Sequence, residues 1–311
     1  MGGRRVRERP LTTAYVSAQT LEEALSALAD GARPVAGGTD LVVGARQGKS
    51  PLPESIVAIH RLDELRGLAS EDGGLRLGAL VTHDEIAADA VVRERLTALA
   101  DASAIVGSRA TRAQGTVGGN VMNASPAMEI GGPLMVFGAE VTLRAASGER
   151  RVPVSELLTG PGATSAAGDE LLTAVGVPFP SEGTGSCYAR LEYRRQMEIA
   201  VVGATAAVTL AGERVEHARV AITALAPTIR LVPEAEEALV GTDGGAEPVQ
   251  AAAQAAAGAA EPISDVRASA DYRRAMAEVL ARRVLTAAVA RARGEKVAVP
   301  ASTTLFGMGA S

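Results

Sequence analysis

Apolar residues in the first sixty positions follow the period of a strand and the period of a helix in turn. The predicted elements alternate strand, helix, strand, helix, strand, over residues 14–16, 20–31, 33–36, 40–47 and 55–59. Thr20 and Glu23 are spaced as a capping box, and the apolar stripe that follows them ends at Gly31. Because strands alternate with helices, this region is predicted to be a βαβ-type unit.

The region between residues 62 and 177 mixes helices with strands in which polar and apolar residues alternate. Strands are predicted over residues 75–78, 140–145, 151–154 and 171–177, and a helix over residues 91–104. The second and third of these strands form a hairpin around the turn at Ser147 and Gly148. Thr82 and Glu85 are a second capping box, and residues 134–137 form a buried stretch. We expect this region to be a second α/β unit, built on a mixed sheet.

A segment rich in Pro, Gly and Ser, residues 178–185, predicts a linker before the last region. Three long strands and three helices follow, over residues 186–193, 199–210, 215–225, 235–240, 249–260 and 271–293. The pattern predicts an α+β protein of two α/β subdomains, residues 1–60 and 61–180, and a C-terminal domain of antiparallel strands packed with helices, residues 186–295. We expect residues 296–311 to be a flexible tail.

Composition narrows the classes of function. With 311 residues, 47% of them hydrophobic, the chain is long enough for two or three packed units, and its net charge of −5 gives no basic surface for nucleic acid. The basic start, from Arg4 to Arg9, is interpreted as a solvated extension rather than a nucleic-acid arm. No apolar run approaches the about 20 residues that cross a bilayer, and no apolar segment follows the basic start as in a secretory signal. We therefore expect a cytoplasmic protein without a membrane span.

The side chains that usually carry catalysis are few. Cys187 is the only cysteine, so the chain cannot form an internal disulfide or hold an iron–sulfur cluster by itself. His60, His83 and His217 lie far apart without metal-ligand spacing, and we interpret them as exposed or capping residues. No catalytic residue and no metal ligand is predicted. A bound cofactor is therefore expected to carry the chemistry.

Two glycine pairs stand out in the sequence. One lies in residues 36–41, AGGTDL, and the other in residues 116–120, TVGGN. Glycine pairs let a ligand approach closely, and successive backbone N–H groups form an anion site. Two such loops indicate a diphosphate held from both sides, and hence a dinucleotide. The spacing of Gly115, Gly118 and Gly119 does not satisfy the Rossmann fingerprint, which disfavours a nicotinamide-binding Rossmann domain.

These loops and two later motifs resemble those of a known family. The segments AGGTDL (36–41), TVGGNVMNASP (116–126), YRR with EIA (193–200) and RASADYR (267–273) follow one another in this order. They resemble the FAD-binding subunits of molybdenum hydroxylases, a family that includes the medium subunit of aerobic carbon monoxide dehydrogenase and the FAD domain of xanthine dehydrogenase. The resemblance implies an FAD-binding fold over nearly the whole chain and FAD as the cofactor.

The resemblance also implies which residues hold FAD. The glycines of both loops would wrap the diphosphate with backbone amides, while Glu129 and Ile199 would lie near the flavin end. Glu129 stands where Asp is commoner in the family, and Ile199 has the alternative of a core residue in an alternating strand. Arg194 and Arg195 are interpreted as structural or interface residues. The full implied set is Ala36, Gly37, Gly38, Thr39, Asp40, Leu41, Thr116, Gly118, Gly119, Asn120, Ala124, Ser125, Glu129 and Ile199.

By the same resemblance, the chain is one piece of an electron-transfer complex. Its partners would be a small subunit with two [2Fe-2S] clusters and a large molybdenum-cofactor subunit, assembled as a dimer of heterotrimers. FAD would accept electrons from the clusters and pass them to an external acceptor. Two alternatives stay open: a self-contained FAD oxidoreductase, and an assembly subunit that has lost its flavin. No pattern in the chain encodes the substrate or the final acceptor, whether NAD, quinone or oxygen.

Overall fold

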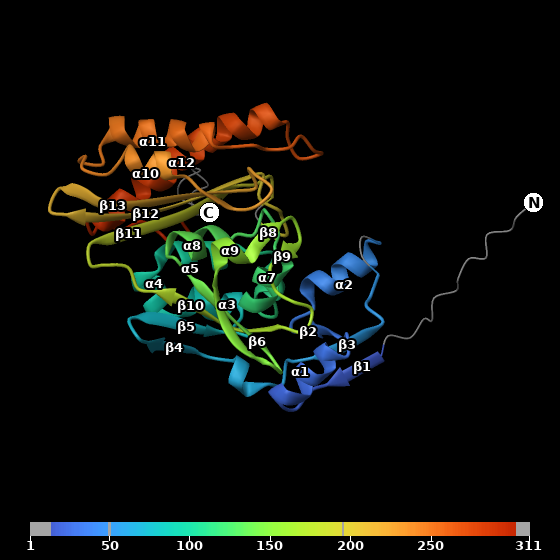
Figure 1. Cartoon of the computed structure of the whole chain (residues 1–311). Coiled ribbons are helices and arrows are strands. Elements are labelled where there is room, and N and C mark those ends of the chain that lie inside the picture. The colour runs from blue at the N-terminus through green and yellow to red at the C-terminus, as the bar shows by residue number, and fades with distance from the viewer. Residues whose placement is uncertain (1–13, 49–50, 195, 303–311) are drawn as a thin grey trace, which may run out of the picture.

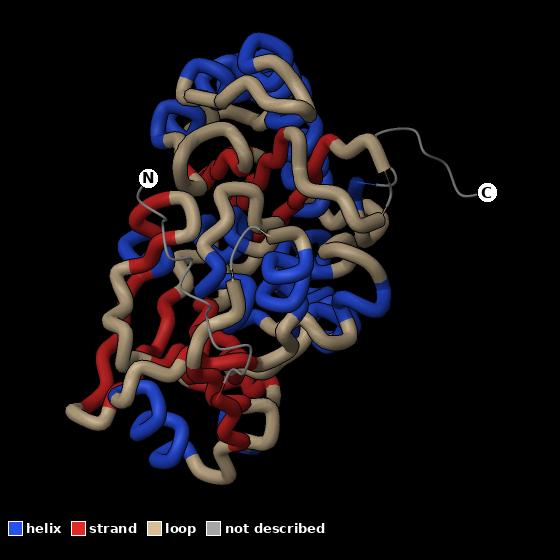
Figure 2. The backbone as a smooth tube through the Cα atoms, turned by 90° about the vertical axis from the view of Figure 1, so that its right-hand side faces the viewer, coloured by secondary structure: helices blue, strands red, loops and turns tan. Residues whose placement is uncertain are grey.

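The computed structural model describes residues 14–48, 51–194 and 196–302, which form three main sheets that follow one another along the chain. Figure 1 shows the N-terminal sheet at one end, a central sheet with helices on one face, and a C-terminal sheet between those helices and a further helical layer. Figure 2 shows the strands and helices of these layers from the side. The predicted α+β class is confirmed.

The N-terminal unit has the predicted βαβ arrangement. Its parallel sheet has the order β1-β3-β2, with residues Ala14–Ser17, Ser55–Ala58 and Arg33–Val35. The Thr20 hydroxyl accepts a hydrogen bond from the N–H of Glu23 at 3.2 Å and begins α1 (Leu21–Ala29), whose apolar stripe is buried. α2 (Thr39–Arg46) begins directly after the first glycine pair and has no buried residue.

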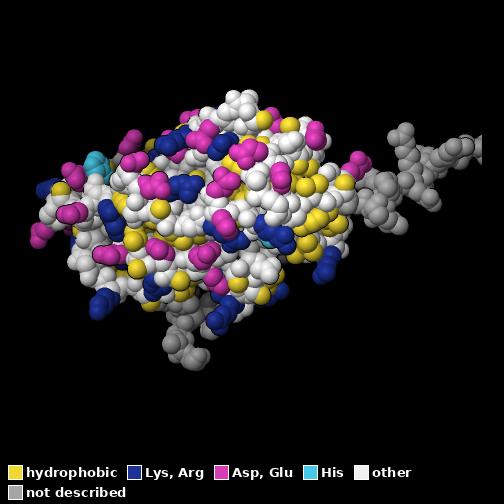
Figure 3. Space-filling model, turned by 90° about the horizontal axis from the view of Figure 1, so that it is seen from below, with side chains coloured by type: hydrophobic (Ala, Val, Ile, Leu, Met, Phe, Trp, Pro, Cys, Tyr) yellow, Lys and Arg dark blue, Asp and Glu magenta, His cyan; other side chains and the backbone are white. Residues whose placement is uncertain are grey.

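The central sheet is antiparallel throughout, so the expectation of a mixed sheet was wrong. Its order is β4-β5-β10-β6-β7, with residues Leu68–Glu71, Gly74–Gly78, Leu171–Pro178, Glu140–Ala145 and Gly148–Pro153. β10 enters between β5 and β6 and runs antiparallel to both, which separates two strands that run in the same direction. In β6, Val141 and Leu143 point into the core, and the sheet face seen from below in Figure 3 carries interspersed acidic and basic side chains.

Short helices accompany the central sheet. The predicted single helix over residues 91–104 is two helices, because Leu96 leaves the helical region with φ −124° and ψ 46°. Asp89 begins the first of them by accepting the N–H of Val92 at 2.9 Å. The elements of this layer are α3 (His83–Ala88), α4 (Ala90–Arg95), α5 (Thr97–Ser103), α6 (Arg109–Arg112), α7 (Val117–Asn123), α8 (Gly131–Val136), α9 (Val154–Leu157), a 3-10 turn (Asp63–Leu65) and the small pair β8 (Leu158–Gly160) and β9 (Ala163–Thr164).

The C-terminal sheet is antiparallel, as predicted, and packs between two helical layers. Its order is β11-β12-β13-β14, with residues Thr184–Leu191, Val202–Ala211, Arg214–Thr223 and Arg230–Leu231. One face is covered by α10 (Pro233–Glu237), α11 (Ala246–Gly258) and α12 (Ala270–Ala292), and the other by helices of the central unit (Figure 1). β12 begins only at Val202, so Ile199 lies outside it and is 45% exposed; the core alternative for Ile199 was wrong.

The segment after α12 also departs from expectation. Ala301 and Ser302 are buried, and the N–H of Arg190 donates to the Ser302 hydroxyl at 3.3 Å. The flexible tail expected from residue 296 was therefore wrong up to residue 302, because this segment is packed and hydrogen-bonded. Residues 303–311 of that expectation lie outside the described residues.

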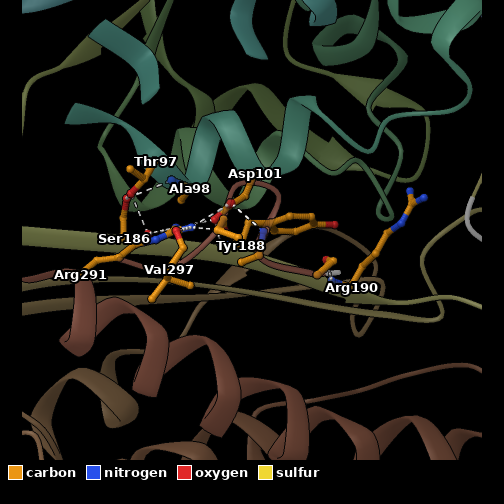
Figure 4. Close-up of polar contacts among 11 residues, drawn as sticks. Thr97, Ala98, Asp101, Ser186, Tyr188, Arg190, Arg291 and Val297 are labelled. Carbon is orange, nitrogen blue, oxygen red and sulfur yellow. Dashed lines mark hydrogen bonds and ion pairs between the residues drawn. The ribbon is translucent and has the colours of Figure 1, made fainter. Parts of the chain in front are cut away.

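One buried ion pair joins the central and C-terminal units. Asp101 on α5 accepts two hydrogen bonds from Arg291 on α12, at 2.6 and 3.1 Å (Figure 4). The same carboxylate accepts the backbone N–H groups of Tyr188 on β11 at 3.2 Å and of Ala301 at 2.9 Å. Arg291 also donates to the backbone carbonyl of Ser186 at 2.6 Å. Four chain segments thus meet at two buried and fully bonded charges, which fix how the C-terminal sheet sits on the central helices.

Removing one partner of this pair is expected to destabilise the protein strongly. In Asp101→Ala, Arg291 keeps a buried charge without its carboxylate, so the free energy of unfolding is expected to fall by about 3–5 kcal/mol. Denaturant unfolding followed by circular dichroism measures this change.

The matched control is Asp271→Ala. Its carboxylate pairs with Arg274 at 3.4 Å but is 98% exposed, and the loss is expected to be less than about 1 kcal/mol. Equal losses in the two variants would contradict the role given to the buried pair.

Candidate functional site

The two glycine loops meet in the structure. A Cβ atom on Gly37 would lie 1.9 Å from the carbonyl oxygen of Gln114, so only glycine lets the first loop pack on the backbone that leads into the second. A Cβ atom on Gly115 would lie 3.6 Å from the Thr39 hydroxyl. Residues 36–41 and 114–120 therefore form one junction, which we call the loop junction.

The first loop leaves its backbone donors open. Gly38, with a φ of +68°, precedes α2 as its N-cap, and the N–H of Val42 donates back to the Gly38 carbonyl at 3.0 Å. The N–H groups from Gly37 to Leu41 have no acceptor among the described residues. The positive end of the α2 dipole lies at the same place. This loop can therefore bind an anion through its backbone.

The backbone N–H groups of the second loop already donate hydrogen bonds within the protein. The N–H groups of residues 117–120 donate within the protein, at 2.8, 3.0, 3.2 and 2.9 Å, to Val81 O, Ala79 O, Thr116 Oγ1 and Thr116 O. Gly118 serves close packing, because a Cβ there would lie 2.8 Å from the Ala79 carbonyl oxygen. The side-chain oxygen of Asn120, in contrast, is buried and has no hydrogen-bond partner among the described residues. The polar atom that this loop leaves free is thus on a side chain.

The turn after α7 is fixed by its own hydrogen bonds. Ala124 ends α7 with a φ of +47°, a conformation uncommon outside glycine. Its carbonyl accepts the N–H of Gly162 at 3.0 Å, and the Ser125 hydroxyl accepts the N–H of Ala127 at 3.2 Å. Ala124 and Ser125 therefore hold the shape of the second loop, and their contact with a ligand stays a prediction.

Glu129 is buried against the C-terminal sheet. Its carboxylate is paired with the guanidinium of Arg190 on β11, and a carboxylate oxygen of Glu192 lies 2.6 Å from Nε of the same guanidinium. Burial raises the pKa of Glu129, and the nearby Arg190 charge opposes that shift. The structure therefore places Glu129 in an ion-pair cluster between units, and its contact with the flavin stays a prediction.

Ile199 lies in the loop between β11 and β12, and this loop is tied to the central unit. The N–H of Met197 donates to the carbonyl of Gly107 at 2.9 Å, seven residues before Gln114. Arg194 pairs with a glutamate of the same loop at 3.0 Å, in agreement with a structural role. Arg195 lies outside the described residues.

Sequence reasoning missed the position of His83. This residue is 2% exposed, its Nδ1 atom has no partner among the described residues, and burial is the main cause that lowers its pKa to about 4. Its backbone N–H donates to the carbonyl of Gly115 at 3.1 Å, so it lies against the second loop. The available signal was the apolar Ile86 three residues later, on the same helical face. His60 and His217 are exposed, as predicted.

The chain is similar to known flavoprotein subunits. Residues 9–180 match the family described as FAD binding domain in molybdopterin dehydrogenase, and residues 187–288 match the CO dehydrogenase flavoprotein C-terminal domain. The chain is 32% identical to the carbon monoxide dehydrogenase medium chain of Hydrogenophaga pseudoflava, over 86% of this chain and 92% of that protein. It is 30% identical to the xanthine dehydrogenase FAD-binding subunit of Escherichia coli O157:H7, over 90% and 97%. A solved carbon monoxide dehydrogenase from Hydrogenophaga pseudoflava has a TM-score of 0.86 at 31% identity, covering 91% of this chain and 99% of that chain.

The residues of the loop junction fit FAD. A diphosphate is an anion that requires several donors, and the first loop presents open N–H groups at a helix N-terminus. The buried, unpartnered side-chain oxygen of Asn120 gives the second loop an acceptor, which can bind a hydroxyl or N–H group of FAD but not the diphosphate. The first loop therefore has the donors that a diphosphate requires, and the second loop offers an acceptor to another part of the cofactor.

Gly37→Ala tests the contact between the loops. The added Cβ would overlap the backbone at Gln114, so the loops must separate, and the Kd for FAD is expected to rise by about 5- to 150-fold, which corresponds to the 1–3 kcal/mol cost of overpacking. Fluorescence titration of the apo chain with FAD measures this rise.

Gly168→Ala is the matched control, because a Cβ at that glycine meets nothing within 4 Å. It is expected to leave the Kd unchanged. Unchanged binding in Gly37→Ala would mean that the site does not need the close packing of the two loops.

Proposed function

The chain belongs to the FAD-binding subunits of the molybdopterin dehydrogenases, and on this basis we propose that it carries electrons from a partner subunit to an external acceptor. The observation that carries the proposal is the loop junction, where the loop with the open N–H groups of Gly37 to Leu41 packs on Gln114 and Gly115, directly before the second glycine pair. FAD supplies the chemistry when bound, because it stores two electrons and exchanges them singly. The chain binds and orients it.

The two loops have different tasks in this proposal. The first loop neutralises the diphosphate with backbone donors, and Thr39 and Asp40 continue that contact in the first turn of α2. The second loop, whose amides are bonded within the protein, contributes the side chain of Asn120 and the shape of its turn. The exposed Ile199 is proposed to lie near the flavin end, on a loop held to the central unit.

We propose that the electron donor lies on a partner subunit. Cys187 is the only cysteine, and it is buried on β11, where burial is the main cause that raises its thiol pKa well above the ordinary value. Iron–sulfur clusters need several thiolate ligands. We therefore propose that a small subunit with two [2Fe-2S] clusters delivers electrons to FAD, and that a large subunit with the molybdenum cofactor oxidises the substrate.

The relatives support an assembly of this kind through their names, which include a medium chain and an FAD-binding subunit. We propose a dimer of heterotrimers. The names of relatives also include different substrates, among them carbon monoxide, xanthine and caffeine, so we assign substrate choice to the partner. Among the described residues, no helix is long and apolar enough to cross a membrane, and a cytoplasmic location stays a prediction.

Asn120→Ala is expected to weaken FAD binding. Loss of a hydrogen bond from a buried polar site costs about 1–3 kcal/mol, so the Kd is expected to rise by about 5- to 150-fold. Asn123→Ala, on the last turn of the same helix, is the matched control and is expected to bind FAD as the wild type does. Equal Kd values for the two variants would remove Asn120 from the proposed site.

Reconstitution tests the function itself. The chain loaded with FAD should show a flavin absorption spectrum, and its flavin should be reduced only when the partner subunits and their substrate are added. Turnover of a substrate by the isolated chain would favour the self-contained oxidoreductase. A purified complex in which this chain holds no flavin would favour the assembly subunit.

A further inference from the structure

His83 lies where the loop junction rests on the central unit. Its backbone N–H donates to the carbonyl of Gly115 at 3.1 Å, and the preceding Thr82 is bridged to Thr116. A Cβ atom built on Gly115 would lie 3.4 Å from Cδ2 of the imidazole and 3.6 Å from the Thr39 hydroxyl. Gly115 therefore lies between the imidazole and the first turn of α2.

The imidazole of His83 is buried in surroundings that favour its neutral form. His83 is 2% exposed, and its Nδ1 has no hydrogen-bond partner among the described residues. A protonated imidazole has two N–H donors, so the donor at Nδ1 would be buried without an acceptor. Burial is the main cause that lowers the pKa of His83 to about 4; Arg112 lowers it further, and Asp84 opposes both.

The neighbouring carboxylates are already bonded to groups other than the imidazole. Asp84 is paired with Arg112 at 3.1 Å, and Glu85 accepts the N–H of Thr82 at 2.7 Å. Partial burial raises the pKa of Asp40 in the first loop, which makes that residue the other titratable group of the junction. The charged groups on α3 and on the helices packed against it are Asp84, Glu85, Arg93, Glu94, Arg95, Asp101, Arg109 and Arg112.

We propose that His83 is a positioning residue for the FAD site: the neutral imidazole supports the loop junction through Gly115, and its protonation opens the junction and releases FAD. This inference rests on the proposed function, because it requires FAD to be held between the two loops. It predicts that acid removes the cofactor before it unfolds the chain.

The pH range over which FAD is released follows from two states of the loop junction. In the closed state the junction holds FAD, and in the open state it does not. In the open state His83 meets water and takes up a proton below its ordinary pKa of 6.5, whereas in the closed state it does so only near 4. The closed state is therefore fully favoured above pH 6.5 and loses stability as the pH falls from 6.5 to about 4. Between pH 7.5 and pH 5 the ratio of closed to open junctions falls by up to about thirtyfold.

The experiment measures the Kd of the full-length chain for FAD by flavin fluorescence from pH 7.5 to pH 5, with far-ultraviolet circular dichroism on the same samples. In the wild type the Kd is expected to rise severalfold, up to about thirtyfold, while the dichroism stays constant. His83→Gln and His83→Asn are expected to have a Kd that hardly depends on pH. The exposed histidines give matched controls, and His60→Gln and His217→Gln are expected to keep the wild-type profile.

Three results would overturn the inference. One is a folded His83 variant that keeps the wild-type pH profile, and another is a wild type that loses FAD only together with its secondary structure. The third is loss of the pH dependence in Asp40→Asn, which would make Asp40 the sensor. If neither His83 variant folds, the wild type alone tests the inference, through the comparison of the pH at which FAD is released with the pH at which the circular dichroism changes. A wild type that binds no FAD at pH 7.5 would instead refute the proposed function.

Discussion

The arrangement of the C-terminal sheet on the central helices depends on a carboxylate that water does not reach. Asp101 is fully buried, and such a charge is stable only when several donors surround it. Its donors come from β11, α12 and the segment after α12, so each of these segments must take one position relative to α5. An apolar contact of the same area would tolerate sliding, whereas a bidentate ion pair does not.

The same interface carries a second buried pair, which extends the constraint toward the candidate site. Ser186, Tyr188 and Arg190 alternate along β11 and face the central unit, while Cys187 and Ala189 face α12. Arg190 reaches Glu129, which follows the second glycine loop in the chain. The second loop is therefore built into the interior, which explains why its amides are bonded within the protein. The first loop belongs to a separate small unit and keeps its donors open.

How much the sequence predicted depends on the range of the contact. The capping box of Thr82 and Glu85 has both of its hydrogen bonds, and the elements of the N-terminal unit lie close to their predicted bounds, because local patterns encode these features. The Asp101–Arg291 pair spans 190 residues, and no local pattern shows that two charges so far apart will meet. The break at Leu96 and the insertion of β10 between β5 and β6 likewise arise from packing of distant segments.

In the candidate site, too, some features could be predicted from local sequence and others depend on distant contacts. A site made of backbone N–H groups requires particular side chains only where the chain must bend or approach closely, so Gly37 and Gly38 mark it in the sequence. A buried histidine is marked only indirectly, here by the apolar Ile86 on its helical face, since His83 differs from His60 and His217 in what packs around it. The conformational freedom of glycine belongs to the residue itself, whereas the protonation state of a histidine depends on its surroundings. The cofactor class could therefore be predicted from the sequence, while the group that makes its retention depend on pH required the structure.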